Sequence, residues 1–216
     1  MKALTISFIL LFLTANLNAQ LIVNEIMPAP EGGEPEWIEI YNKSENEFTL
    51  KNGTISDAKK TSGLPELTLL QGNFALITSE KQTLSEMYDI PADCKIYEVS
   101  LPVFNNTNDI AVLKNSSGGI LDSIYYDMDW GEKGNSLERA DPADEALTNE
   151  NWSKPEDGVK ATPGRRNSVS GVFFDLSLDS LKYSNDVLSI SVSNKGEKSS
   201  WEALLEVFID ENEDGK

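Results

Sequence analysis

The fold is decided by LIVNEIM at residues 21–27 and by WIEIYN at residues 37–42. In the second segment Ile38 and Ile40 alternate with Trp37 and Tyr41, and alternate residues of a strand point to opposite faces of a sheet. Apolar side chains therefore occur on both faces. This pattern predicts a strand that packs on a core with one face and is covered by a loop or a second layer on the other.

Short apolar segments of this kind recur along the chain between Gly, Pro, Asn and Asp, which is typical of an all-β sandwich or barrel. Predicted strands cover residues 21–27, 37–41, 48–56, 67–70, 74–78, 96–99, 109–114, 120–126 and 136–139. The clearest hairpin joins residues 110–114 to 120–126, because Gly118 and Gly119 in its loop can adopt positive φ. Only residues 81–88 have the spacing of a short helix.

Residues 1–19 have the features of an export signal. Lys2 supplies a positive charge, and residues 3–13 form an apolar run too short to span a bilayer. Leu17 and Ala19 occupy the positions that a signal peptidase reads. An uncleaved N-terminal anchor is the alternative. The sequence therefore predicts a secreted or cell-surface protein, with no membrane insertion after the signal is cleaved.

The composition excludes several classes of function. The chain has 36 Asp and Glu against 18 Lys and Arg, a net charge of −18, which disfavours binding to nucleic-acid phosphates. Histidine is absent, which excludes Ser-His-Asp and Cys-His hydrolases and histidine-ligated zinc. Cys94 is the single cysteine, so no internal disulfide forms. We expect Cys94 to be a half-buried small hydrophobe or a spare loop thiol.

A second module is predicted after the first domain. Residues 149–166 are polar, and we interpret them as the closing part of a first domain, residues 21–168, that runs into a linker near residues 167–171. The β-like pattern then restarts at residues 172–178, 187–193 and 203–209. Residues 172–216 are too few to close a sandwich. We therefore expect a partial, truncated second module, or one that leans on the first domain.

Six features of the sequence follow one another in a fixed order. They are residues 21–27 with 36–42, LKNGTISD at 50–57, residues 69–77, NDIAVLKNSSGGILDSIYY at 108–126, GNSLER at 134–139, and Thr162-Pro163-Gly164 with Asn167. Together they resemble the lamin tail domain of secreted bacterial proteins. The resemblance implies an immunoglobulin-like antiparallel β-sandwich without a known catalytic centre, used for attachment or interaction. One departure is Gly53, where family members often carry tryptophan. Residues 175–216 are similar to CARDB or other immunoglobulin-like modules.

One candidate metal site lies near residue 216. Asp210, Asn212 and Asp214 occupy positions 1, 3 and 5 of a calcium loop, with Gly215 at the turn. A strand-like segment precedes them instead of the helix of an EF-hand, and a metal-free hairpin turn is the alternative. Calcium is the one cofactor that the sequence suggests.

Glu25, Glu34, Glu36 and Glu39 form an acidic cluster in the sequence. A pair of carboxyl groups can hydrolyse glycosidic bonds when one is held protonated and the other ionised. Glu36 and Glu39 are three residues apart in a strand, however, so they should point to opposite faces. We therefore interpret these four residues as solvated strand and loop acids.

Other candidate residues are aromatic or hydroxylic. The tryptophans and tyrosine that could stack on sugars are Trp37, Tyr41, Trp130 and Trp152, but packing is the usual role of such residues in a sandwich. Residues 129–131 are the group expected to be exposed. Ser136 is not a nucleophile elbow, because the second glycine of that motif and any histidine are missing.

These features predict a secreted, non-catalytic binding, adhesion or structural module. Loops at residues 28–35, 127–133 and 141–151 would meet an extracellular protein or a glycan, and nucleic acid is not expected as a partner. The oligomeric state is left open. The alternative is the accessory domain of an exported nuclease, phosphatase or protease whose catalytic part lies beyond residue 216.

Overall fold

The computed structural model describes residues 20–143, 146–147, 149–170, 176–184 and 187–194. Contacts divide the chain into two compact units, Met1–Ser170 and Gly171–Lys216. Each unit is described by itself.

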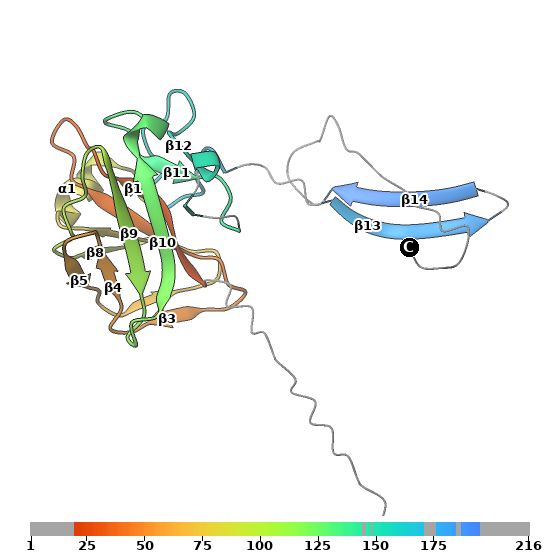
Figure 1. Ribbon diagram of the computed structural model, residues 1–216, viewed down its shortest axis with the longest axis horizontal. Coiled ribbons are helices and arrows are strands. Elements are labelled where there is room, and N and C mark those ends of the chain that lie inside the picture. Colours follow the sequence, from red (N-terminus) through yellow and green to blue (C-terminus); the bar gives the residue numbers. More distant parts are fainter. Residues whose placement is uncertain (1–19, 144–145, 148, 171–175, 185–186, 195–216) are drawn as a thin grey trace, which may run out of the picture. The chain divides into compact units, whose positions relative to one another are not determined.

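Unit 1 is built from two main β-sheets and one small one (Figure 1). The six-stranded sheet has the order β12 (Trp152–Ser153), β11 (Leu137–Arg139), β1 (Leu21–Met27), β2 (Trp37–Asn42), β7 (Phe74–Thr78) and β8 (Lys95–Glu98). The four-stranded sheet has the order β10 (Ile120–Asp127), β9 (Asn108–Lys114), β4 (Thr54–Ser56) and β5 (Thr61–Gly63). A third pair joins β3 (Phe48–Leu50) to β6 (Leu67–Leu69). All neighbours are antiparallel except β7 and β8. This arrangement confirms the immunoglobulin-like all-β sandwich.

The inner face of the six-stranded sheet carries the main core. Ile38 and Ile40 are completely buried there together with residues of β4, β9 and β10. A β-bulge in β1 shifts the register between Val23 and Glu25, so Val23 and Ile26 both face this core although they are three residues apart. The same bulge turns Glu25 to the opposite face. It therefore decides which side chains of β1 are apolar core and which lie outside it.

An ion pair fastens the two main sheets to each other inside this core. Arg139 of β11 lies 3.0 Å from the Asp122 carboxylate of β10, and the two side chains are only 4% and 9% exposed. Asp122 also accepts the backbone N–H of Val23 at 2.8 Å. One carboxylate thus joins β10 to both β11 and β1.

The outer face of the six-stranded sheet is also covered. Helix α1 (Lys81–Met87) packs Leu84 beside Trp37, Leu76 and Met27 in a second apolar cluster, which includes the buried Cys94. The predicted helix, the packing role of Cys94 and the two-sided burial of β2 are therefore confirmed.

The predicted strand at residues 48–56 is wrong, because it is two strands in different sheets. The chain turns between β3 and β4 at Asn52, which has a φ of 49°. A Cβ atom on the next residue, Gly53, would lie 2.6 Å from Leu50 Cδ2 and 3.0 Å from the Lys114 carbonyl oxygen. This turn has no room for the tryptophan that related sequences often carry at this position.

The sequence prediction missed strands β5 and β12. They have three and two residues, and neither shows an apolar alternation. The hairpin of β9 and β10 is confirmed, with Gly118 at a φ of 81° in its loop.

Unit 2 is described as one antiparallel hairpin of β13 (Leu176–Ser184) and β14 (Val187–Asn194). The strand predicted at residues 187–193 is confirmed. The strand predicted at residues 172–178 overlaps β13 only at its end, and residues 203–209 lie outside the described residues. Among the residues with a described structure, no helix is both long and apolar enough to cross a membrane.

Candidate functional site

Three glutamates lie side by side on the outer face of the six-stranded sheet. Glu25 of β1 is the cross-strand partner of Glu39 on β2 and of Glu138 on β11. All three are completely buried, at 0% exposure. We refer to Glu39, Glu25 and Glu138 as the carboxylate row. The interpretation of Glu25 and Glu39 as solvated acids is therefore wrong.

The carboxylate row is covered by residues 160–169, which we call the strap. The backbone N–H of Thr162 donates to Glu25 at 2.9 Å, and that of Gly164 donates to Glu39 at 2.6 Å. The Thr162 hydroxyl contacts Glu138 at 2.6 Å and Glu25 at 3.3 Å. The Ser168 hydroxyl and the Val169 N–H both donate to Glu138, at 2.7 and 3.0 Å. Each carboxyl group thus has at least one partner in the strap.

Side chains of the sheet and of the strap complete these bonds. Ser136 is completely buried and donates its hydroxyl to Glu25 at 2.6 Å. Asn24 donates to Glu39 and to Asn167, both at 2.9 Å. Asn167 donates in turn to the carbonyl oxygens of Asn24 and Arg139. Residue 167 is therefore a buried anchor of unit 1, and it lies just before the boundary between the two units at residues 170 and 171.

Burial changes the protonation of this row. Removal from water raises the pKa of Glu25 to about 8, and the neighbouring Glu138 carboxylate adds to the rise. Burial, together with the Glu25 carboxylate, likewise raises the pKa of Glu39 well above its ordinary value. Glu25 is therefore mainly protonated at neutral pH, and Glu39 keeps its proton to a higher pH than a solvated glutamate does, which lets neighbouring carboxyl groups remain close together without water.

The other two predicted acids are also more buried than expected. The Glu34 side chain is completely buried, accepts hydrogen bonds from Trp37 Nε1 and the Tyr88 hydroxyl, and forms an ion pair with Lys160 of the strap. Glu36 is half-buried and accepts the Phe104 N–H at 3.2 Å. Burial raises the pKa of Glu36. Three of the residues that contact these acids, Tyr88, Phe104 and Lys160, come from distant parts of the chain.

The buried acids do not form an accessible reaction centre. Glu25, Glu39, Glu138 and Ser136 all have zero exposure, so a substrate has no access to them in this conformation. Within the described part of the chain, no three His, Cys, Asp or Glu side chains are grouped as metal ligands. The calcium candidates Asp210, Asn212 and Asp214 lie outside the described residues.

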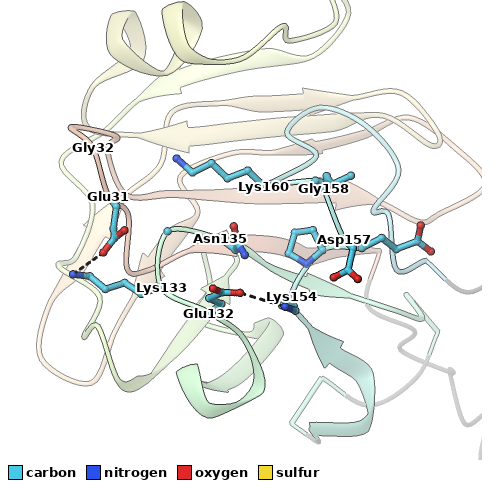
Figure 2. A pocket seen from close by; sticks show the side chains of 13 residues that line it. Glu31, Gly32, Glu132, Lys133, Asn135, Lys154, Asp157, Gly158 and Lys160 are labelled. Carbon is cyan, nitrogen blue, oxygen red and sulfur yellow. Dashed lines mark hydrogen bonds and ion pairs between the residues drawn. The ribbon is translucent and has the colours of Figure 1, made fainter.

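A cavity of about 670 Å³ opens beside the strap (Figure 2). Its walls come from three segments: Glu31 and Gly32, residues 132–135, and residues 154–160. This volume is within the range of small-molecule and peptide-side-chain pockets. The predicted loops at residues 28–35 and 127–133 both contribute to it, whereas the predicted loop at residues 141–151 does not.

Backbone hydrogen bonds hold these three segments together. Gly134 donates its N–H to the Ala29 carbonyl oxygen at 2.9 Å, and its φ of 83° suits glycine. Ser136 donates its N–H to the Lys160 carbonyl oxygen at 3.1 Å. Lys160 therefore belongs to both the cavity wall and the strap.

The cavity is lined mainly by charged side chains. Lys133 lies 3.1 Å from Glu31, and Lys154 lies 3.2 Å from Glu132, as Figure 2 shows. Other charged residues in the lining are Glu156, Asp157 and Lys160. These exposed pairs add little stability. They provide donors and acceptors of both signs to a bound group.

None of the four predicted aromatic residues lines this cavity. Trp37 and Trp152 are core residues, at 0% and 2% exposure. Tyr41 stacks on Phe74, and Trp130 packs edge-on against Tyr125. In residues 129–131 Asp129 is exposed, whereas Trp130 and Gly131 are partly exposed. The packing role predicted for the aromatic residues is confirmed.

Comparison with known proteins identifies the family. The sequence model described as Lamin Tail Domain matches residues 14–127, more than half of the chain. No curated protein matches significantly. The features at residues 134–139 and 162–167 lie beyond the matched residues, but the structure packs both against β1. The family match agrees with the immunoglobulin-like sandwich seen in the structure. The chain belongs to the lamin tail domain family.

Proposed function

We propose that this chain is an exported, non-catalytic module that binds an extracellular partner through the cavity between residues 31–32, 132–135 and 154–160. The observation that supports this most is the contrast between two groups of polar residues. The carboxyl groups suited to acid–base chemistry are buried under the strap, whereas the exposed charges converge on an open cavity. Export rests on the features of residues 1–19 in the sequence.

A polypeptide partner fits the cavity better than a glycan does. Sugar rings are commonly bound by stacking on aromatic side chains, and the lining residues include none. The lining instead offers lysine and carboxylate groups within reach of one another. Such groups suit a peptide that carries side chains of both charges.

The first prediction concerns Lys133 and Lys154. We expect Lys133→Glu/Lys154→Glu to weaken binding at least about tenfold, since losing one good charged contact costs about 1.4 kcal/mol or more. The full chain is first screened against immobilised matrix proteins, peptidoglycan and a glycan array. Surface plasmon resonance then compares the variants on whichever probe is bound.

The control for this experiment is Lys51→Glu/Lys59→Glu. It changes the net charge equally, and neither lysine lines the cavity. Equal weakening by both double variants would show a general charge effect and contradict the proposal. Failure of the full chain to bind any probe would also count against it, and binding to glycans alone would overturn the preference for a polypeptide.

A further inference from the structure

We infer that the strap is a proton-controlled latch: it stays closed over the carboxylate row while Glu25 and Glu39 carry protons, and it opens when they lose them, before the two sheets separate. The strap is the last segment of unit 1. Its first residue, Lys160, lines the cavity. Opening would therefore also remove one cavity wall, a consequence that rests on the proposed function.

The geometry concentrates the strap's bonds on the row. Thr162, Gly164, Ser168 and Val169 all donate to one of its three carboxyl groups. Further bonds connect Lys160 to Glu34 and Arg165 to Asp89. The Asp89 partner is exposed, so this last bond is weak. A change of charge in the row therefore acts on the bonds of four strap residues, whereas Asn167, Lys160 and Arg165 bind partners outside the row.

Among the contacts described for Glu25 and Glu39, none brings a positive charge to either carboxyl group. Across the sheet each faces another carboxyl group of the row. From the chain around α1 come the Tyr88 hydroxyl on Glu34, the Cys94 thiol and the nearby Asp93. From the strap, Lys160 and Arg165 bind Glu34 and Asp89. The described bonds to Glu25 and Glu39 come from Asn24, Ser136, Thr162 and Gly164, which are neutral.

Ionisation of the row has a direct physical consequence. Like charges a few ångströms apart in a dry site repel strongly, and each buried carboxylate also lacks most of its hydration. Lifting the strap exposes the row to water, which removes both penalties. It also breaks the bonds from Thr162 and Gly164 that favour the ionised carboxylates, but burial is the larger influence on the pKa of both acids. The two sheets meet on the opposite face of β1 and β2, so the main core can remain intact.

Cys94 provides a built-in reporter of strap opening. It is the single cysteine of the chain and is 8% exposed. A Cβ atom on Gly164 of the strap would lie 2.9 Å from Cys94 Cβ and 3.0 Å from its sulfur, so the strap lies directly on this thiol. Removing the strap should therefore open Cys94 to a small alkylating reagent.

The test measures iodoacetamide labelling of Cys94 in the full chain between about pH 7 and pH 9. At each pH the labelling rate of the urea-unfolded chain is divided by the labelling rate of the folded chain. This ratio is the protection factor, and it corrects for the fraction of Cys94 present as thiolate. Linkage allows up to a tenfold change per pH unit for each proton released. We expect protection to fall at least about tenfold, with unchanged far-UV circular dichroism and tryptophan fluorescence.

Variants separate the latch from a general effect of pH. Glu25→Gln/Glu39→Gln should keep protection constant within about twofold, and each single substitution should remove only part of the slope. Glu36→Gln is the matched control, since the half-buried Glu36 directly precedes β2 and its described side-chain bond goes to Phe104 and not to the strap, and it should behave like the wild type. The latch would be contradicted if protection in the double variant depended on pH as strongly as in the wild type. It would also be contradicted if the circular dichroism signal were lost together with protection. If the double variant fails to fold, the single variants decide. Cys94 labelling needs no partner, so its outcome is independent of the cavity's function.

Discussion

Replacing Asp122 by alanine should destabilise unit 1 by about 3–5 kcal/mol, the cost typical of removing one partner from a buried ion pair. The Asp122 carboxylate has two partners on the opposite sheet, Arg139 at 3.0 Å and the Val23 N–H at 2.8 Å. Alanine would leave the buried guanidinium without this counter-charge and the bulge N–H without this acceptor. The measurement is urea denaturation followed by the fluorescence of Trp37, Trp130 and Trp152.

Two other substitutions show whether burial is the cause. Asp122→Asn keeps an oxygen for the Val23 N–H but loses the charge, so a smaller loss is expected. Glu66→Ala breaks the exposed pair with Lys51, whose side chains are 67% and 56% exposed, and should cost less than about 1 kcal/mol. Similar losses for Asp122→Ala and Glu66→Ala would mean that the Asp122–Arg139 pair is not a buried fastener.

The free energy of unfolding should decline as the pH rises from about 5 to 8. The ordinary pKa of Glu25 is 4.5 and the folded value is about 8, so within this window the folded state holds a proton that the unfolded state has released. Its contribution to stability is complete below the unfolded pKa and is lost as the pH rises through the folded pKa. Glu39 acts with the same sign. Each group contributes a slope of up to about 1.4 kcal/mol per pH unit.

Urea denaturation at a series of pH values measures this slope. Glu25→Gln and Glu39→Gln each replace a carboxyl group whose pKa is raised by burial with a neutral amide of similar shape. Each should flatten the profile and leave the variant relatively more stable at alkaline pH. A wild-type stability that rises steadily from pH 5 to 8 would contradict the assignment of protons to the row.

Strand positions and faces in the first unit could be predicted because they depend on local alternation. Ile38, Ile40 and Trp37 take the faces that their spacing indicates. The prediction failed where a single residue interrupts the pattern. Positive φ at Asn52 divides a predicted strand, and the bulge at Asn24 moves Glu25 off the core face.

The carboxylate row was missed because its cover lies far away in the sequence. Thr162 and Glu25 are separated by 137 residues, and Gly164 and Glu39 by 125. Glutamate in a strand is ordinarily solvated, so nothing local indicates burial. One signal was available: Thr162, Gly164 and Asn167 belong to a feature of the family resemblance, and they turn out to be the residues that hold the strap.

The cavity was predictable in part. Loops 28–35 and 127–133 were expected to meet a partner, and residues from both line it. The third wall, residues 154–160, was interpreted only as a closing segment. Its position depends on long-range bonds such as the one from the Ser136 N–H to the Lys160 carbonyl oxygen.

The most direct test of the account is a carbon-13 NMR titration of the glutamate side-chain carboxyl groups in the full chain, assigned with Glu25→Gln and Glu39→Gln. Because both acids are buried supports of the fold, we expect Glu25 to titrate near pH 8 and Glu39 well above the ordinary glutamate range. Titration of both residues near the ordinary value of about 4.3 would place them in water and contradict this expectation.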